Sequence, residues 1–176
     1  MGNDAEVPSE AEWLNRVVAE FERPLSRYAL SITHNADRAL DAVQETFLLL
    51  VQHAGEIDRA HPAPWLFTVC RTKAIDLLRK DGRMEARPRK DLAERASAEP
   101  PAEDVAVLRE DITEAERLLA LLPPREREVL RLKFQEGLRY KEIAAVTGLS
   151  ISHVGVMIHQ AMARLRRRKA GPPNGA

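Results

Sequence analysis

Residues 140–158 read YKEIAAVTGLSISHVGVMI, and this stretch decides the fold class of the C-terminal half. A helix-turn-helix requires a small residue where its two helices touch, a glycine in the turn and apolar anchors on both helices. Ala144, Gly148 and Val154 have the spacing that suits these roles. Ser150 follows the turn and can cap the second helix through its hydroxyl. The segment therefore predicts a helix-turn-helix, with apolar anchors at Ile143, Leu149, Val154 and Ile158.

The second helix of such a motif lies in the major groove of DNA, where its outward side chains meet base edges. Glutamine pairs with adenine, serine is adaptable, and valine or methionine contacts a thymine methyl group. Histidine and arginine suit phosphates, which set affinity and register. We expect base contacts from Ser152, His153, Val156, Met157 and Gln160, and phosphate contacts from His159 and Arg164. The alternative is a helical hairpin that packs and binds nothing, which the basic residues of 164–169 disfavour.

The N-terminal part shows apolar residues at every third or fourth position, which is typical of amphipathic helices. The first such stretch covers 13–32, and Pro24 predicts a kink or a restart within it. Asn35 and Asp37 offer a turn and an N-cap for a second helix. That helix should stop around residues 53–55.

A third helix is expected to begin at Pro62 and Pro64, because proline suits the first turn of a helix, and to end at Gly82. The following stretch, 83–106, is rich in charge and proline and poor in apolar residues. Such composition predicts a flexible linker. A short surface helix between residues 91 and 98 is the alternative.

Helical spacing resumes in residues 107–122 and, after the break at Pro123 and Pro124, continues to Gly137. No segment has the pattern of a β-strand. The sequence therefore predicts an all-α protein of two small helical domains joined by a flexible linker, with the helix-turn-helix in the C-terminal domain. The expected domain ranges are 10–82 and 107–170, and the linker is 83–106.

Composition excludes several classes of function. The formal net charge is zero, which is unusual for a nucleic-acid binder, but the basic residues gather at the C-terminal end. Cys70 is the single cysteine, so no disulfide within the chain and no cysteine-based zinc site is expected. No nucleophile motif, glycine loop or metal-ligand spacing is present, so we expect no catalytic residue, no metal and no cofactor. Polar, acidic residues at 1–12 and the absence of a long apolar run predict a cytoplasmic protein without membrane insertion.

Two sets of motifs, in order along the chain, resemble a known family. Residues 39–48 (ALDAVQETFL), 64–66 (PWL) and 76–79 (DLLR) resemble the N-terminal domain of bacterial RNA polymerase sigma factors. Residues 122–130 (LPPREREVL), 136–138 (EGL) and 140–144 (YKEIA) resemble their promoter-reading C-terminal domain. With two domains, a short linker and little else, the chain is most similar to the extracytoplasmic-function group.

The resemblance implies two partners, core RNA polymerase and promoter DNA. The helix of residues 39–48 would grip the polymerase clamp, and an acidic and apolar stripe suits docking on a basic coiled coil. The third helix would capture the melted minus-ten strand, which positive charge holds. The implied polymerase-binding residues are Asp41, Gln44, Glu45 and Leu48, and the implied minus-ten residues are Arg71, Lys73, Asp76, Arg79 and Lys80. Trp65 is expected in the core rather than as a base-stacking residue.

By the same resemblance, the helix-turn-helix would read a minus-thirty-five element. The sequence departs from the family pattern at three places. Thr72 stands where the family usually has asparagine, and Arg139 replaces the usual Ser or Thr cap, so we expect a weaker helix start there. The recognition helix has fewer basic residues than is usual. Phosphate contacts are therefore expected from Arg164 onward and from neighbouring helices, at Arg125 and Lys133.

The predicted function is that of a sigma factor, and the chain is not expected to be an enzyme. An anti-sigma factor is a possible further partner. The alternative is a sigma-like module that only sequesters an anti-sigma factor and would not need DNA contacts. The basic tail and the lack of an attached receiver domain favour the sigma factor.

Overall fold

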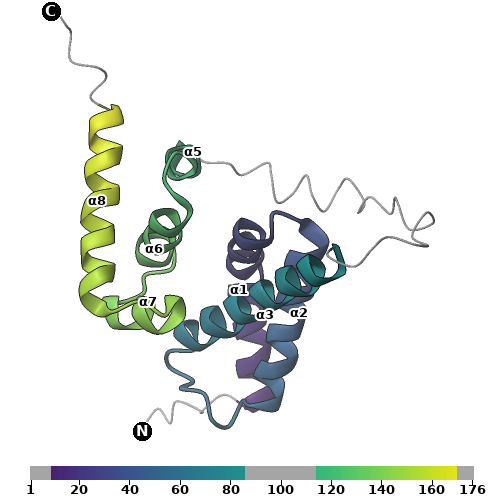
Figure 1. Cartoon of the computed structure of the whole chain (residues 1–176). Helices are drawn as coiled ribbons and strands as arrows, with labels where there is room; N and C mark the ends of the chain where they lie inside the picture. The colour runs from purple at the N-terminus through teal and green to yellow at the C-terminus, as the bar shows by residue number, and fades with distance from the viewer. Residues whose placement is uncertain (1–8, 86–113, 170–176) are drawn as a thin grey trace, which may run out of the picture. The chain divides into compact units, whose positions relative to one another are not determined.

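The computed structural model describes residues 9–85 and 114–169, and within these two ranges every regular element is an α-helix (Figure 1). This confirms the all-α class. The chain divides into two compact units, unit 1 (Met1–Val105) and unit 2 (Ala106–Ala176). The predicted linker and its alternative surface helix lie outside the described residues, except for residues 83–85.

Helix α1 (Glu10–Thr33) runs without interruption through Pro24, so the predicted restart is wrong. A proline costs one backbone hydrogen bond in a helix. Here the apolar residues on both sides of it, such as Val17, Leu25 and Tyr28, are buried in one core, and this packing keeps the helix continuous. The helix ends at His34, whose φ of 53° is left-handed.

Helices α2 (Ala36–Gln52) and α3 (Ala63–Glu85) complete unit 1. The predicted N-cap at Asn35 is confirmed, since its side-chain oxygen accepts from the backbone N–H of Arg38 at 3.0 Å. Helix α3 continues past Gly82, so its predicted end there is wrong. One glycine inside a helix costs only about 1 kcal/mol relative to alanine, which does not stop a long helix.

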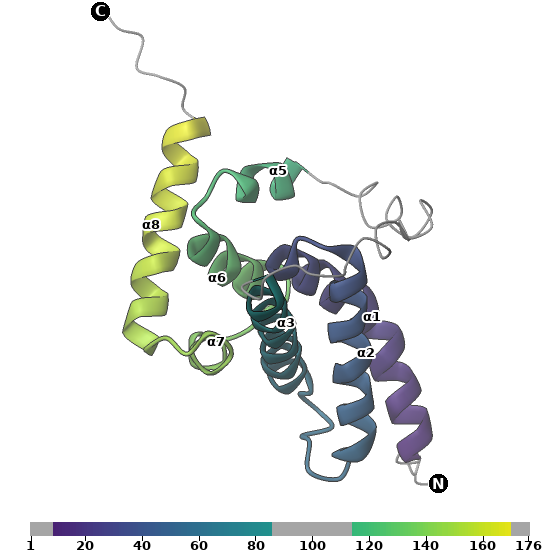
Figure 2. The ribbon, with the colours of Figure 1, turned by 45° about the vertical axis from the view of Figure 1, so that its right-hand side comes forward.

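The three helices of unit 1 pack against one another pairwise (Figure 2). Tyr28 of α1 and Phe67 of α3 form the aromatic centre of the core, with ring centroids 5.2 Å apart in an edge-to-face arrangement. Leu25, Leu50 and Leu66 are fully buried around them. This packing leaves the outer faces of α2 and α3 available for partners.

Unit 2 contains α5 (Glu114–Ala120), α6 (Pro124–Phe134), α7 (Tyr140–Thr147) and α8 (Ile151–Lys169). The start of α6 at Pro124 confirms the predicted break, and the helix ends three residues before Gly137. Helix α8 packs on both α6 and α7. The core is built from the fully buried side chains Leu132, Leu138, Ile143 and Val154. The part of the predicted helix that precedes residue 114 lies outside the described residues.

In residues 9–85 and 114–169, no helix by itself has the length and apolar character to cross a membrane. One bent pair of helices, Tyr140–Thr147 and Ile151–Arg168, has together the length and composition of a membrane span, with a bend of 101° between the two helices. These are the two helices of the predicted helix-turn-helix, and their apolar sides supply Ile143 and Val154 to the core.

Candidate nucleic-acid and protein interfaces

The helix-turn-helix is formed by α7 and α8, as predicted. Gly148 ends α7 with a φ of 73°, in the left-handed region that favours glycine, and its N–H donates to the carbonyl of Ala144 at 2.9 Å. The hydroxyl of Ser150 accepts from the backbone N–H of His153 at 3.2 Å and so caps α8. Ala144 is buried at the helix contact.

The start of α7 shows what compensates for the missing Ser or Thr cap. Arg139 occupies the cap position, and its backbone N–H donates to the carboxylate of Glu142 at 2.7 Å. This bond is one half of a capping box. The other half, in which a side-chain oxygen of the cap residue accepts from the N–H of Glu142, is missing because arginine has no side-chain oxygen. The sequence contained the signal, since Glu142 stands three residues after the cap, but the prediction missed it.

The outward face of α8 carries most of the predicted base-contacting side chains. Ser152, His153, Val156, His159 and Gln160 are exposed, with Val156 at 52%. Met157 is only 6% exposed, so its predicted place on the outward face is wrong. Positions 154, 157, 158 and 161 share the helix face that packs on the core, because residues three and four apart lie on one side of a helix. Ile151, which the prediction did not include, is exposed at the first turn of α8.

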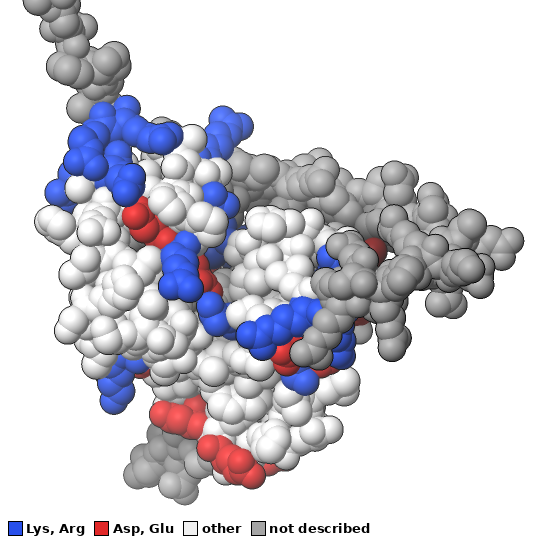
Figure 3. All heavy atoms as spheres, viewed as in Figure 1, with Lys and Arg blue, Asp and Glu red and all other residues white. Residues whose placement is uncertain are grey.

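Two of the predicted phosphate-binding side chains have partners inside unit 2. The Nε atom of Arg164 lies 3.2 Å from a carboxylate oxygen of Glu126, on α6. The ammonium group of Lys133 donates to the carbonyl of Leu138 at 3.3 Å and lies 5.5 Å from the ring centroid of Tyr140. Exposed positive charge also lies at Arg125 and at the C-terminal end of α8 (Figure 3), namely Arg166, Arg167 and Arg168. Arg117, Arg139 and Lys141 are exposed as well.

The outer face of α2 carries the predicted polymerase-binding residues. Asp41, Gln44 and Leu48 are exposed, and Glu45 is half-buried. Leu48 is 63% exposed. Val51, one turn further on, is also exposed, and the prediction did not include it. The face is thus acidic at its beginning and apolar at its end.

The predicted minus-ten residues lie along α3, and one of them meets α2. Lys73 forms an ion pair with Glu45, with 2.8 Å between Nζ and Oε2. Asp76 lies 3.8 Å from Arg79 on the same helix, whereas Arg71 is half-buried. A hollow of about 270 Å³ lies where the two predicted faces meet, lined by Glu45, Lys73, Asp76, Leu77, Arg79 and Lys80.

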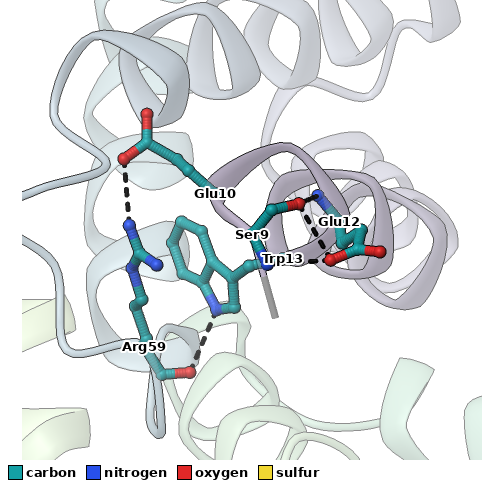
Figure 4. A network of polar contacts seen from close by, with 5 residues as sticks. All are labelled: Ser9, Glu10, Glu12, Trp13 and Arg59. Atoms are coloured by element: carbon teal, nitrogen blue, oxygen red, sulfur yellow. Dashed lines mark hydrogen bonds and ion pairs between the residues drawn. The ribbon is translucent and has the colours of Figure 1, made fainter. Parts of the chain in front are cut away.

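A polar network ties the loop between α2 and α3 to the first turn of α1 (Figure 4). The indole N–H of Trp13 donates to the carbonyl of Arg59 at 3.1 Å, and the guanidinium of Arg59 pairs with Glu10 at 2.9 Å. Bonds from the backbone N–H and hydroxyl of Ser9 lower the pKa of Glu12 below its usual 4.5. The network fixes the loop against the helix bundle. Ser9 and Glu12 form a capping box, which is a local sequence signal. The contacts of Arg59 with Trp13 and Glu10 have no such signal, because these partners are far apart along the chain.

Two further residues that could take part in binding or chemistry, Trp65 and Cys70, lie in unit 1. Trp65 is half-buried, and its ring centroid lies 6.4 Å from that of His53, so it is not a fully buried core residue. Cys70 is fully buried, and this burial raises the pKa of its thiol to about 12. Among the described residues, no group of three His, Cys, Asp or Glu side chains is arranged to hold a metal ion.

Comparisons with known proteins agree with both halves of this arrangement. Residues 17–84 match the family model for Sigma-70 region 2, and residues 112–165 match the one for Sigma-70, region 4. The ECF RNA polymerase sigma factor RpoE of Cereibacter sphaeroides is 33% identical over 134 residues, which are 75% of this chain and 72% of that protein. The chain belongs to the extracytoplasmic-function group of RNA polymerase sigma factors.

A second curated relative supports this membership, and solved structures show the same fold. SigD of Mycobacterium tuberculosis is 33% identical to this sigma factor over 158 residues, covering 86% of this chain and 74% of that protein. The sigma factor RpoE of Bartonella quintana, solved with the anti-sigma factor NepR, has a TM-score of 0.60 at 22% identity, covering 86% of this chain and 93% of that one. CnrH, solved with the cytosolic domain of CnrY, has a TM-score of 0.55 at 26% identity, with coverage of 87% and 84%.

Family membership defines the general function. The factor directs promoter-specific initiation of transcription, and its family binds core RNA polymerase and promoter DNA and is not enzymatic.

Proposed function

We propose that the outer face of α2 docks this sigma factor on core RNA polymerase, through Asp41, Gln44, Glu45 and Leu48. The observation that carries this proposal is the exposure of Leu48 beside two carboxylates on a helix whose other side is buried. Leu48 and Val51 are both exposed, and an apolar patch rimmed by polar residues is typical of a protein interface. The carboxylates supply complementarity to a basic partner surface. Val51 extends the same face at its apolar end.

The outer face of α3 then holds the melted minus-ten strand. Its charged side chains are Arg71, Lys73, Asp76, Arg79 and Lys80, four of them cationic. Single-stranded DNA is held by such a cationic surface together with contacts to its exposed bases. Trp65 is half-buried on the same helix, so part of its ring remains accessible to a base.

Unit 2 reads the minus-thirty-five element through the outward face of α8. Base contacts come from the exposed residues Ser152, His153, Val156 and Gln160. Met157 is left out because it is buried. Phosphate contacts come from Arg125, Lys133, His159 and Arg164, among which Lys133 and Arg164 also hold partners inside the unit.

The division of labour follows the proposed domain ranges. Residues 10–82 form the polymerase-binding and minus-ten domain, residues 83–106 form the linker, and residues 107–170 form the minus-thirty-five domain. Two DNA elements read by linked domains give avidity and a preferred spacing between the elements. The factor acts in the cytoplasm, where its template and polymerase are.

An anti-sigma factor is the proposed regulatory partner. Solved structures of similar fold include RpoE with the anti-sigma factor NepR and CnrH with the cytosolic domain of CnrY. In this chain the exposed apolar residues Leu48 and Val51 offer such a partner a surface that competes with the polymerase.

Transcription in vitro with core polymerase, on a library of candidate promoters, tests the proposal. We expect initiation at a defined set of promoters. Replacing Asp41 and Leu48 together by alanine should weaken core binding by about tenfold or more, as expected for a contact in the centre of an interface. The matched control is Glu20→Ala, which removes an exposed carboxylate on α1. A chain that initiates nowhere but binds a protein partner tightly would instead be a sigma-like module that sequesters an anti-sigma factor.

A further inference from the structure

The outward face of α8 contains a glycine, Gly155, against which the ring of Tyr140 lies. Positions 152, 155, 156 and 159 share one side of α8, because residues three and four apart on a helix are neighbours. A Cβ atom at Gly155 would lie 3.6 Å from Cε2 and 3.9 Å from Cδ2 of Tyr140. Tyr140 is the first residue of α7. The contact therefore brings an aromatic side chain from one helix of the helix-turn-helix to the outward face of the other.

Gly155 provides space rather than an unusual backbone conformation. In the described part of the chain, the glycines with a positive φ are Gly137 and Gly148, so the backbone does not require glycine at position 155. Glycine also stabilises a helix interior less than alanine does. A Cβ atom would be in ordinary van der Waals contact with the ring, but a longer side chain pointing the same way would have to displace it. The missing side chain is thus what seats the ring of Tyr140.

A second contact holds the same ring from α6. The Nζ atom of Lys133 lies 5.5 Å from the ring centroid of Tyr140, and it donates to the carbonyl of Leu138 at 3.3 Å. A cation above an aromatic ring is attracted by its π-electrons. Tyr140 nevertheless remains 40% exposed. The ring is therefore held in place by two neighbours and is still accessible to a partner.

The outward face of α8 offers little charge for reading bases. Residues 151–163 contain no lysine or arginine, so the bidentate contact of these side chains to guanine has no source in this stretch. Val156, next to Gly155, is 52% exposed and can offer a base only apolar contact. The apolar group that base pairs present in the major groove is the methyl group of thymine. An apolar surface on this face therefore suits a thymine.

We propose that Tyr140, seated on Gly155, is a specificity-determining residue that forms with Val156 an apolar surface for the methyl group of a thymine in the minus-thirty-five element. This inference rests on the proposed function of unit 2. Gly155 is a positioning residue, because it acts through the place that it leaves for the ring. The minus-thirty-five element accordingly contains a thymine whose methyl group is recognised by the ring of Tyr140.

Replacement of thymine by deoxyuridine tests this proposal, since uracil pairs with adenine in the same way and lacks only the methyl group. Holoenzyme is assembled from core polymerase and the full-length chain and bound to a promoter selected from the library. Each thymine of the minus-thirty-five element is replaced in turn. At one position we expect the replacement to weaken binding about fourfold, the effect of losing contact with one methyl-sized group. A selected element without a thymine of this kind would overturn the proposal.

Variants then assign this thymine to the ring. Tyr140→Ala and Gly155→Gln should each remove most of the difference between thymine and uracil at that position, the first by deleting the ring and the second by displacing it. A contact of the new glutamine to adenine would not create such a difference, because the adenine is the same in both promoters. Tyr140→Phe and Gly155→Ala should keep the difference, since they preserve the ring and its seat. Val156→Ala should reduce it at the same thymine.

Phe134→Ala is the matched control, because it removes an aromatic side chain that is 61% exposed on α6, outside the two helices of the helix-turn-helix. It should leave the difference between thymine and uracil unchanged. A loss in Tyr140→Phe equal to that in Tyr140→Ala would show that the hydroxyl group, not the ring, makes the contact and would refute the proposal. So would a difference that persists in Gly155→Gln.

Failure of this inference and failure of the proposed function are distinguishable. If the wild-type holoenzyme initiates at defined promoters, but Tyr140→Ala leaves every difference between thymine and uracil unchanged, only the assignment of Tyr140 is wrong. If the wild-type chain supports initiation at no promoter, the proposed function is wrong as well. Far-UV circular dichroism verifies that each variant retains its helices.

Discussion

Arg164 supports the buried carboxylate of Glu126, and replacing it by methionine is expected to destabilise unit 2. The Nε atom of Arg164 lies 3.2 Å from Oε1 of Glu126, whose side chain is only 9% exposed. The other carboxylate oxygen, Oε2, is buried without a hydrogen-bond partner in the described part of the chain. Methionine keeps most of the apolar stem of the arginine and removes the charge, so Arg164→Met leaves Glu126 as a buried, uncompensated anion.

The magnitude follows from the exposure of the two side chains. Breaking a fully buried ion pair costs about 3–5 kcal/mol, but Arg164 is 51% exposed, so water already weakens this pair. A buried polar group left unsatisfied costs about 1–3 kcal/mol. With screening taken into account, the expected loss is about 1–2 kcal/mol. In a unit of this size, each kcal/mol lowers the melting temperature by about 4–8 °C, so we expect a decrease of about 5–15 °C.

The two tryptophans of the chain allow the units to be followed separately. Trp13 and Trp65 both lie in unit 1, so tryptophan fluorescence follows the unfolding of that unit alone. Far-UV circular dichroism follows the helices of both units. Arg164→Met should therefore lower the midpoint of the part of the dichroism transition that fluorescence does not follow, and should leave the fluorescence midpoint unchanged.

Two further variants make the test specific. Arg166→Met removes an exposed arginine on the same helix, and a surface change of this kind should stay within about 0.5 kcal/mol of wild type. The double variant Glu126→Gln, Arg164→Met removes both charges, and should be more stable than Arg164→Met alone. An unchanged unit 2 transition, together with weaker promoter binding and a salt slope shallower by about 0.9, would show that Arg164 serves only DNA phosphates.

Three more predictions concern other parts of the chain. Because burial raises the pKa of the Cys70 thiol to about 12, iodoacetamide should label it at pH 8 only after unfolding in urea; rapid labelling of the native chain would contradict its place in the core. The lowered pKa of Glu12 means that its support of α1 is fully present above about pH 4.5 and is lost as the pH falls through the lowered value. Glu12→Gln should therefore flatten the acid dependence of hydrogen-exchange protection in the first turn of α1, and an unchanged profile would count against this capping interaction. Met157→Ala should lower the free energy of unfolding of unit 2 by about 2–5 kcal/mol and leave the promoter preference unchanged, whereas Val156→Ala should alter the preference and leave the stability unchanged. Thermal unfolding measures the stability, and selection from a promoter library measures the preference. The reverse pattern would refute the orientation of α8.

The sequence predicted those features of the fold that depend on residues close together along the chain. The helix-turn-helix depends on residues within one stretch, and Gly148, Ser150 and Val154 occupy their predicted roles. Met157 was placed on the wrong face because it sits at the edge of the apolar stripe, where one position of helical rotation separates a core residue from an exposed one. The predicted helix end at Gly82 was wrong because α3 continues to Glu85. The free-energy cost of one glycine in a helix is smaller than the stabilisation that the other residues of α3 provide.

The sequence assigned the candidate site residues to individual helices, but it did not predict which of their side chains form pairs. Local rules cover side chains three or four positions apart on one helix. The ion pair of Glu45 with Lys73 joins two different helices, and so does that of Glu126 with Arg164. The bond from Trp13 to Arg59 joins residues 46 positions apart. Packing of the helices creates these contacts, so no spacing in the sequence announces them.

These ion pairs also reduce the number of cations that a chain of zero net charge can offer to DNA. The totals of 27 basic and 27 acidic residues do not show which basic side chains are paired with carboxylates within the fold. Lys73 and Arg164, each assigned to a DNA face, are both held by carboxylates, whereas Arg166, Arg167 and Arg168 are exposed. Binding to DNA alone then draws on fewer cations than the sequence contains, and its salt dependence should be correspondingly shallow. We therefore expect tight promoter binding to require both units and the polymerase together, because each proposed DNA face by itself has part of its charge already neutralised.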